Sequence, residues 1–365
     1  METRKNAASE SFHAKRRKAA LIRVLLAAAA AAAALSAALY LKHRENISPE
    51  HAVRETLDQI TAIDSGTISI LLDENETTRL SDAGAADTLQ KLFEHFSYRI
   101  TGSSISGDSA QVSVKITNID MKKLAKDVRE EQIRRGASAA PSLTQIDRFL
   151  SLGGYGTVSE EGQIRLIRNR KNWTIVQDEN LKKLLTGSLA EDLADPDLLS
   201  AREVLQAYLD SFSSYTEKNW SSYFGQNDIF RTYAPLYPDI DTAFLNKIRD
   251  SYSARISRVD VKGAEASAPV TITSIDMKKV LDVYAKSLVS YAHTVEAITD
   301  DPATLSNTSA KALLDALNSV SDTASTSVTF TLRHTASGWQ IFDTTGLTNA
   351  LLGDMSGALG SFQGE

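Results

Sequence analysis

An eight-residue phrase that occurs twice constrains the fold of this chain more than any other feature of its sequence. ITNIDMKK begins at Ile116, and ITSIDMKK begins at Ile272, 156 residues later. Upstream, FSYRI from Phe96 faces YSARI from Tyr252 at the same spacing. Matches that recur in order at a constant spacing are the mark of an internal repeat. The sequence therefore predicts a body built twice from one unit.

The repeat continues downstream and sets the predicted domain boundaries. NWTIV from Asn172 faces GWQIF from Gly338, and NLKKLLTG from Asn180 faces GLTNALLG from Gly346. We place the first copy at 48–187 and the second at 200–353. The acidic stretch 188–199, with its proline, is the predicted linker, and 354–365 is the predicted C-terminal tail.

Each copy shows one order of predicted elements. Helix start signals open both copies, as Ser48-Pro49 in the first and as a capping box from Ser200 to Glu203 in the second. A short helix, two strands, a long helix, a further helix, a closing strand pair and a terminal helix follow. In the second copy, apolar residues keep helical spacing from Met277 to Ile298, which predicts a helix of six turns. The fold class is α+β.

The repeated phrase is predicted to end a strand and begin the long helix. Asp120 and Asp276 stand at the junction, where a carboxylate can accept hydrogen bonds from the first helical turn. Met121 and Met277 follow on the buried face. The alternative is that each aspartate serves as a general base at the mouth of a pocket. The helix cap is the favoured interpretation.

One tryptophan marks the closing strand pair of each copy. Trp173 and Trp339 are each followed two residues later by isoleucine, the alternation of a half-buried strand. A tryptophan in this place is expected to fill the space between sheet and helix. Stacking on a ligand in a pocket is the alternative.

The N-terminus is predicted to anchor the chain. Residues 24–41 read VLLAAAAAAAALSAALYL without a charge, and the tail 1–23 before them is basic. Eighteen uncharged residues reach the lower limit of a membrane-spanning helix, and a basic flank stays in the cytoplasm. The alternatives are a signal peptide cleaved after Ser36-Ala37-Ala38 and a buried alanine-rich helix. Both the anchor and the signal peptide place the body outside the cytoplasm.

Charge and composition exclude several functions. Residues 1–46 carry nine Lys/Arg and three Asp/Glu, so that the remaining 319 residues carry a net charge of −12. Nucleic acid is therefore not a predicted partner, because phosphate binding needs a cationic face. Cysteine is absent, which excludes disulfides, thiolate metal sites and a lipid-attachment cysteine. The six histidines do not approach metal-ligand spacing. No catalytic, cofactor-binding or metal-binding residues are predicted.

The order of elements resembles the nuclear-transport-factor-two-like superfamily, also described as cystatin-like. In that fold a curved antiparallel sheet wraps a long helix to make a cone, so the resemblance implies two tandem cone-like domains. The pairing of V-x-I-T-N-x-D-M with W-x-I looks like extracytoplasmic domains in lipoproteins and membrane-anchored proteins of Gram-positive bacteria. Those domains have no catalytic motif to transfer. This chain differs from the lipoproteins because it lacks their cysteine.

These observations favour a non-enzymatic envelope protein in the cell membrane. A single N-terminal helix would anchor it, and two outward-facing domains would bind an envelope protein, peptide or wall ligand. The alternative is a small-ligand carrier or ketosteroid-isomerase-like enzyme with a pocket in one cone. For that alternative the candidate pocket residues are Tyr284, Tyr291 and His293. A third interpretation is a structural spacer without a ligand of its own.

Overall fold

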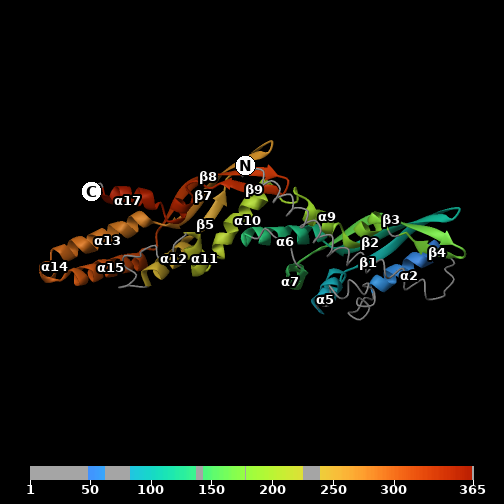
Figure 1. Ribbon diagram of the computed structural model, residues 1–365, viewed down its shortest axis with the longest axis horizontal. Helices are drawn as coiled ribbons and strands as arrows, with labels where there is room; N and C mark the ends of the chain where they lie inside the picture. Colours follow the sequence, from blue (N-terminus) through green and yellow to red (C-terminus); the bar gives the residue numbers. More distant parts are fainter. Residues whose placement is uncertain (1–47, 62–82, 137–142, 177, 225–238, 364–365) are drawn as a thin grey trace, which may run out of the picture. The chain divides into compact units, whose positions relative to one another are not determined.

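The computed structural model describes residues 48–61, 83–136, 143–176, 178–224 and 239–363 (Figure 1). Within these ranges the protein is α+β with antiparallel sheets. The chain divides into two compact units: the first runs to Leu198, apart from Ile133–Arg135, and the second comprises Ile133–Arg135 and the chain from Leu199 onward. The predicted anchor, residues 24–41, lies outside the described residues, and no helix within them is long and apolar enough to cross a membrane.

The first unit holds a four-stranded sheet with the strand order β1-β2-β3-β4. Its elements, in chain order, are α2 (Pro49–Thr61), α5 (Ala83–Leu92), β1 (Ser97–Ser106), β2 (Ser109–Ile119), α6 (Met121–Arg134), α7 (Leu143–Leu152), β3 (Thr157–Asn169), β4 (Asn172–Ile175), α8 (Glu179–Thr186) and α9 (Leu189–Ala194).

Alternation along β2 determines which face of the first sheet is buried. Val112, Val114 and Ile116 are at most 2% exposed, whereas the residues between them face outward. Helix α2 packs on this inner face through Val53 and Leu57, both fully buried. Burying an aliphatic side chain of this size contributes about 1.5–3 kcal/mol, so this pairing of helix and sheet holds the unit together.

The second unit holds a five-stranded sheet with the order β5-β7-β8-β9, and β6 also pairs with β7. Its elements are α10 (Ala201–Ser213), α11 (Glu217–Tyr223), α12 (Asp239–Ser251), β5 (Ser253–Ile256), β6 (Asp260–Lys262), β7 (Glu265–Ile275), α13 (Met277–Ala292), α14 (Glu296–Thr299), α15 (Pro302–Ser319), β8 (Thr323–Thr335), β9 (Gly338–Asp343), α16 (Leu347–Leu351) and α17 (Met355–Gln363).

The two sheets share their register at matching sequence positions. Ile119 pairs with Thr157 where β2 meets β3, and Ile275 pairs with Thr323 where β7 meets β8. In the closing hairpins Arg168 pairs with Trp173, and His334 pairs with Trp339. The repeated segments of sequence therefore occupy the same places in both sheets.

Two segments predicted to be a linker and a tail are helical and packed. Helix α9 lies within 188–199, and its Leu189 and Leu193 are buried in the first unit. Helix α17 lies within the predicted tail and packs on α13, with Ala358 only 4% exposed. Burial of their leucine and alanine side chains is favourable, and a solvated linker or tail would leave these side chains in water.

The long helix of the second unit is shorter than predicted. Helix α13 ends at Ala292, and the turn after it separates the short α14 from it. A new helix, α15, then begins at Pro302, with Asp301 accepting hydrogen bonds from the backbone N–H groups of Ala303 and Thr304. Proline in the first turn and an aspartate cap before it are helix start signals, which compete with continuation of α13.

Candidate functional site

The repeated phrase forms the same strand-to-helix junction in both units. Asp120 accepts a hydrogen bond from the backbone N–H of Lys123 at 2.9 Å, and Asp276 accepts one from Lys279 at 3.1 Å. Each carboxylate thereby satisfies one donor of the first helical turn. Both aspartates act as helix caps, as the favoured interpretation of the phrase predicts.

The methionine after each aspartate points into the interior. Met121 is 3% exposed and Met277 1% exposed. The final glycine of each repeat approaches this junction, since a Cβ at Gly187 would lie 2.8 Å from Met121 Cγ and one at Gly353 would lie 2.0 Å from the carbonyl oxygen of Ile275. The junction is thus a packed structural element.

The two marker tryptophans differ in burial. Trp173 is 5% exposed, and the guanidinium of Arg168 lies 5.6 Å from its ring centre. Trp339 is half-buried, and the ring of His334 meets its edge at 5.1 Å between centroids. Each tryptophan packs against the residue paired with it across the closing hairpin.

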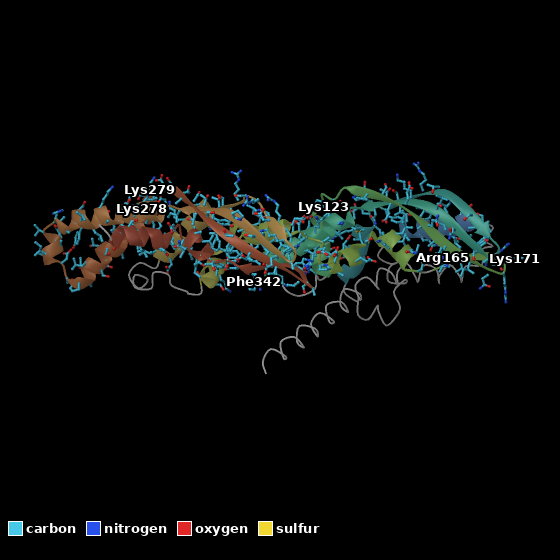
Figure 2. All side chains as sticks on the ribbon, turned by 90° about the horizontal axis from the view of Figure 1, so that it is seen from above. Lys123, Arg165, Lys171, Lys278, Lys279 and Phe342 are labelled. Carbon is cyan, nitrogen blue, oxygen red and sulfur yellow. The ribbon has the colours of Figure 1, made fainter. Side chains whose placement is uncertain are left out.

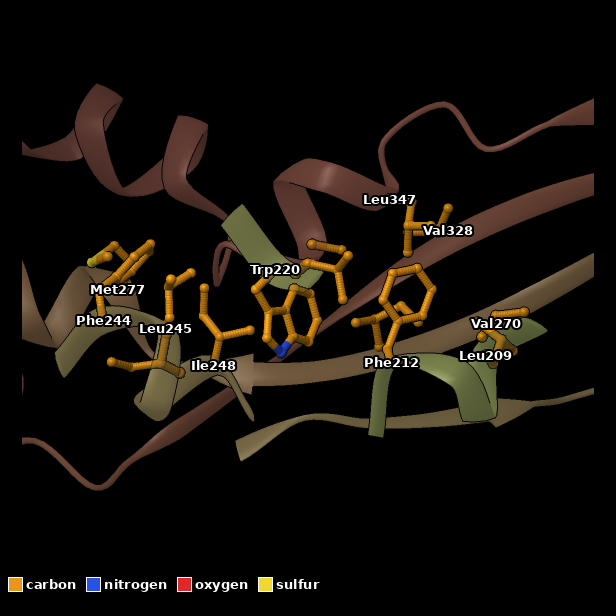
Figure 3. Close-up of a cluster of buried hydrophobic side chains, with 14 of the residues drawn as sticks. Leu209, Phe212, Trp220, Phe244, Leu245, Ile248, Val270, Met277, Val328 and Leu347 are labelled. Atoms are coloured by element: carbon orange, nitrogen blue, oxygen red, sulfur yellow. The ribbon is translucent and has the colours of Figure 1, made fainter. Parts of the chain in front are cut away.

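Aromatic and aliphatic side chains pack together in the interior of the second unit (Figure 3). Trp220 and Phe212 are fully buried, and their rings stack with centroids 5.5 Å apart. Tyr252 packs 5.8 Å from Phe212 and donates a hydrogen bond to the carbonyl oxygen of Leu209 at 2.8 Å. Burial raises the pKa of the Tyr252 and Tyr208 hydroxyls above the ordinary value for tyrosine. These aromatic side chains belong to the continuous buried cluster of the second unit.

Helix α11, which supplies Trp220, is not among the elements predicted from the sequence. Its start is a capping box in which the Thr216 hydroxyl accepts from the backbone N–H of Asn219, and the Asn219 side chain accepts from the backbone N–H of Thr216. Thr216 three residues before an amide side chain is the signal that identifies this helix start. The indole N–H of Trp220 has no hydrogen-bond acceptor within the described parts of the chain.

The three candidate pocket residues lie on the outer helices and do not converge. The Tyr284 hydroxyl is hydrogen-bonded to that of Ser309 at 2.7 Å, and its ring stacks on Phe362 of α17. Tyr291 donates a hydrogen bond to the carboxylate of Asp300, which raises the pKa of the tyrosine. His293 is exposed and ends α13.

Exposed aliphatic side chains lie close together in sequence where α13, α14 and α15 follow one another. Val289 is 58% exposed, Val295 72%, Ile298 87% and Leu305 37%. We name these four residues the hairpin patch. Glu296, Asp300 and Asp301 belong to the same turns, so the patch has acidic neighbours. The predicted helix through Ile298 placed Val295 and Ile298 on a buried face, and the break at His293 turns them outward.

No arrangement of three or more histidine or acidic residues suited to a metal ion is present in the described portion of the molecule. The exposed apolar residues of the hairpin patch are the feature of the second unit that fits binding of a partner.

Comparison with known proteins gives one structural likeness. No family model matches the chain, and no curated protein matches it. A crystal structure of a presumed lipoprotein (ycdA) from Bacillus subtilis aligns with 71% of this chain and 94% of its own, at 13% identity and a TM-score of 0.25. At this TM-score a common fold is not established, so the proposals below rest on the residues of this chain.

Proposed function

We propose that this chain is a membrane-anchored extracytoplasmic protein of the cell envelope that binds a partner protein through its second unit. The anchor is residues 24–41, with the basic tail 1–23 in the cytoplasm. The body is two cone-like domains of the nuclear-transport-factor-two-like type. The basic flank of the apolar run supports a place outside the cytoplasm for the body, and without cysteine this sequence offers no residue for lipid attachment.

The hairpin patch is the observation that carries the binding function. Isolated exposed aliphatic residues are ordinary on protein surfaces, but a group of them close together on consecutive helices marks an interaction site. Helix α17, which packs on α13, adds two more exposed large apolar residues, Leu359 and Phe362, to the four of the hairpin patch.

The chemistry of the patch indicates the chemistry of the partner. Ile298 and Val295 offer an apolar contact, and Glu296, Asp300 and Asp301 supply negative charge next to it. Interfaces commonly combine an apolar centre with a charged rim of complementary sign. The partner is therefore a protein segment with apolar side chains flanked by lysine or arginine.

Site-specific photo-crosslinking in intact cells tests the binding site. A photoreactive residue at Ile298 or Val295 should crosslink a discrete protein partner. The same residue at Val261 of β6, which is 54% exposed and lies outside the patch, is the matched control and should not. Crosslinking from Val261 as efficient as from Ile298, or none from Ile298, would contradict the proposed site.

Protease added to cells whose wall has been removed tests the location. The body should be digested while an N-terminal tag on the basic tail stays protected. A body that stays protected on these wall-less cells and is cleaved only after lysis would overturn the extracytoplasmic assignment.

A further inference from the structure

The closing hairpin of the first unit concentrates positive charge in an acidic protein. Between Arg165 and Lys171 there are four cations and no acid. The segment turns tightly, since Arg170 adopts φ 60° between the paired residues Asn169 and Asn172. We name the segment Arg165–Lys171 the basic hairpin; Figure 2 shows Lys171 at the end of the first sheet and Arg165 further from that end.

The basic hairpin shares its end of the sheet with the β1–β2 turn. The backbone N–H of Arg168 donates to the carbonyl oxygen of Asp108 at 2.7 Å, so the two turns lie side by side. Two aliphatic residues at this end are unusually exposed, Ile105 at 59% and Ile167 at 52%; the strand register places them on opposite faces of the sheet, so both are offered to a surface that meets the sheet end-on. This end of the sheet thus combines clustered cations with exposed isoleucines.

The chain also enters the first unit at this end. Ser103, near the end of β1, donates a hydrogen bond to the carboxylate of Glu50 in the first turn of α2. Tyr98, at the start of β1, donates to Asp58 near the end of the same helix. Helix α2 therefore runs away from the two turns, and its first residues lie beside them.

Six residues, 42–47, separate the predicted anchor from Ser48. A fully extended chain of this length spans at most about 20 Å. A span at 24–41 therefore holds this end of the first unit within about 20 Å of the bilayer surface. That is less than the width of an ordinary domain.

We infer that the basic hairpin and its two exposed isoleucines dock on anionic phospholipid of the bilayer in which the chain is anchored. This inference rests on the proposed anchor. Arginine and lysine are attracted to anionic headgroups, and exposed aliphatic side chains gain by entering the boundary between headgroups and acyl chains. A soluble polyanion would satisfy the cations alone and would leave Ile105 and Ile167 in water.

The acidic groups near the hairpin do not cancel its charge. Arg165 has Asp178 at 3.6 Å, and Glu50 and Asp108 lie at the same end of the sheet. Within the described part of the chain, these three carboxylates stand against the four cations of the basic hairpin. Because Arg170 and Lys171 form the tip of the turn, their positive charges lie furthest out from the sheet.

The second unit shows that this hairpin fold does not require the cations. His334 donates its backbone N–H to the carbonyl oxygen of Ala264 at 2.8 Å and pairs with Trp339, as Arg168 does with Asp108 and Trp173. The matching positions there are His334, Ala336 and Ser337 in place of Arg168, Arg170 and Lys171. The second unit's matching segment 331–337 carries one cation, Arg333, where the basic hairpin carries four.

A spin label tests the docking in the full chain. Because the chain has no cysteine, Ser106→Cys places one nitroxide at the β1–β2 turn, and Ser337→Cys places a control label in the second unit's hairpin. The labelled proteins are reconstituted in vesicles of phosphatidylcholine with or without phosphatidylglycerol. We expect the label at position 106 to contact lipid when phosphatidylglycerol is present, and the label at 337 to stay in water.

The residues of the second unit supply the matched variant. Arg168→His, Arg170→Ala and Lys171→Ser together remove three cations with side chains that the same hairpin fold already carries. A basic residue near an anionic surface contributes about fivefold, so the ratio of docked to undocked label should fall by about 100-fold. Ile105→Ser with Ile167→Ser should lower it independently at constant charge.

The outcomes separate this inference from the anchor on which it rests. If the protein floats with vesicles after a carbonate wash but the label at 106 stays in water, the docking is wrong and the anchor stands. If the protein does not float, the proposed anchor itself is wrong. Equal contact in vesicles with and without phosphatidylglycerol, or contact unchanged in the triple variant, would also overturn the docking.

Discussion

The two strand-to-helix junctions are alike in geometry and different in what lies behind them. Both end a strand with a capping aspartate and bury a methionine at the next position. Behind Met121 the first unit divides its apolar residues between two clusters, one on the inner face of the sheet and one around α6. Behind Met277 the second unit has one continuous cluster that contains Phe212, Trp220 and Phe244.

This difference shows which part of the fold the junction controls. The cap determines where the strand stops and in which direction the helix begins, because its hydrogen bond is local. The interior is filled by whichever side chains the later helices supply, and volume and rotamers must match there. A repeated phrase can therefore stand in front of two separate apolar clusters in one unit and one continuous cluster in the other.

Removing one buried ring should break the second unit and leave the first intact. Phe212 is fully buried. The ring centroids of Tyr208, Trp220 and Tyr223 lie within 5.5 Å of its own. Phe212→Ala should lower the unfolding free energy of that unit by about 3–5 kcal/mol.

Urea unfolding followed by tryptophan fluorescence checks this effect. A Trp173→Phe background reports only the second unit, whose two tryptophans remain. Hydrogen exchange of β2 is the control for the first unit. Loss of protection in β2 as large as in β7 would show that the two cores are not separate.

The final glycines of the two repeats should respond unequally to the same substitution. Gly187 and Gly353 both have positive φ, 58° and 71°, so alanine strains either by about 1 kcal/mol. At 353 the new Cβ would also meet the carbonyl oxygen of Ile275, which is backbone and cannot move aside. At 187 it would meet the flexible side chain of Met121.

We therefore expect Gly353→Ala to cost about 3 kcal/mol, since overpacking against backbone adds to the strain, and Gly187→Ala about 2 kcal/mol, since Met121 Cγ and Cβ, at 2.8 and 3.2 Å, must shift. Thermal unfolding of each single variant measures both values. Equal costs would mean that the two junctions tolerate crowding alike, against the geometry described above.

Local signals account for what the sequence predicted well. The alternation of Val112, Val114 and Ile116, the capping box at Ser200 and the caps at Asp120 and Asp276 depend on neighbours within four residues. Such patterns can be recognised without knowledge of the tertiary structure. The antiparallel α+β class and the junctions follow from them.

The features that were missed depend on contacts distant in sequence or on a competing local signal. Helix α17 is held by packing on α13, which no pattern within the predicted tail reveals. The end of α13 follows from Asp301-Pro302, which was outweighed by apolar spacing through Ile298. The basic hairpin was interpreted only as a strand pair, although four cations within seven residues were visible.

The one residue in which the repeated phrases differ offers the finest comparison. Ser274 is fully buried and donates its hydroxyl to the carbonyl oxygen of Leu351 at 2.6 Å, at the end of α16. Asn118, its counterpart, is 6% exposed; its carbonyl oxygen accepts from the backbone N–H of Ile119, and its amide nitrogen has no acceptor among the described residues. A buried donor without a partner costs about 1–3 kcal/mol.

Substitutions at these two positions should therefore change the free energy of unfolding in opposite directions. Ser274→Ala should destabilise the second unit by about 1 kcal/mol, because it removes the donor to a helix-end carbonyl. Asn118→Ser should stabilise the first unit by about 1 kcal/mol, because it removes an amide without an acceptor. Urea unfolding of each variant against the parent, with Thr174→Ala on the exposed face as control, measures both. A loss of stability in Asn118→Ser would show that the asparagine amide has a partner and that the phrase is equally satisfied in both units.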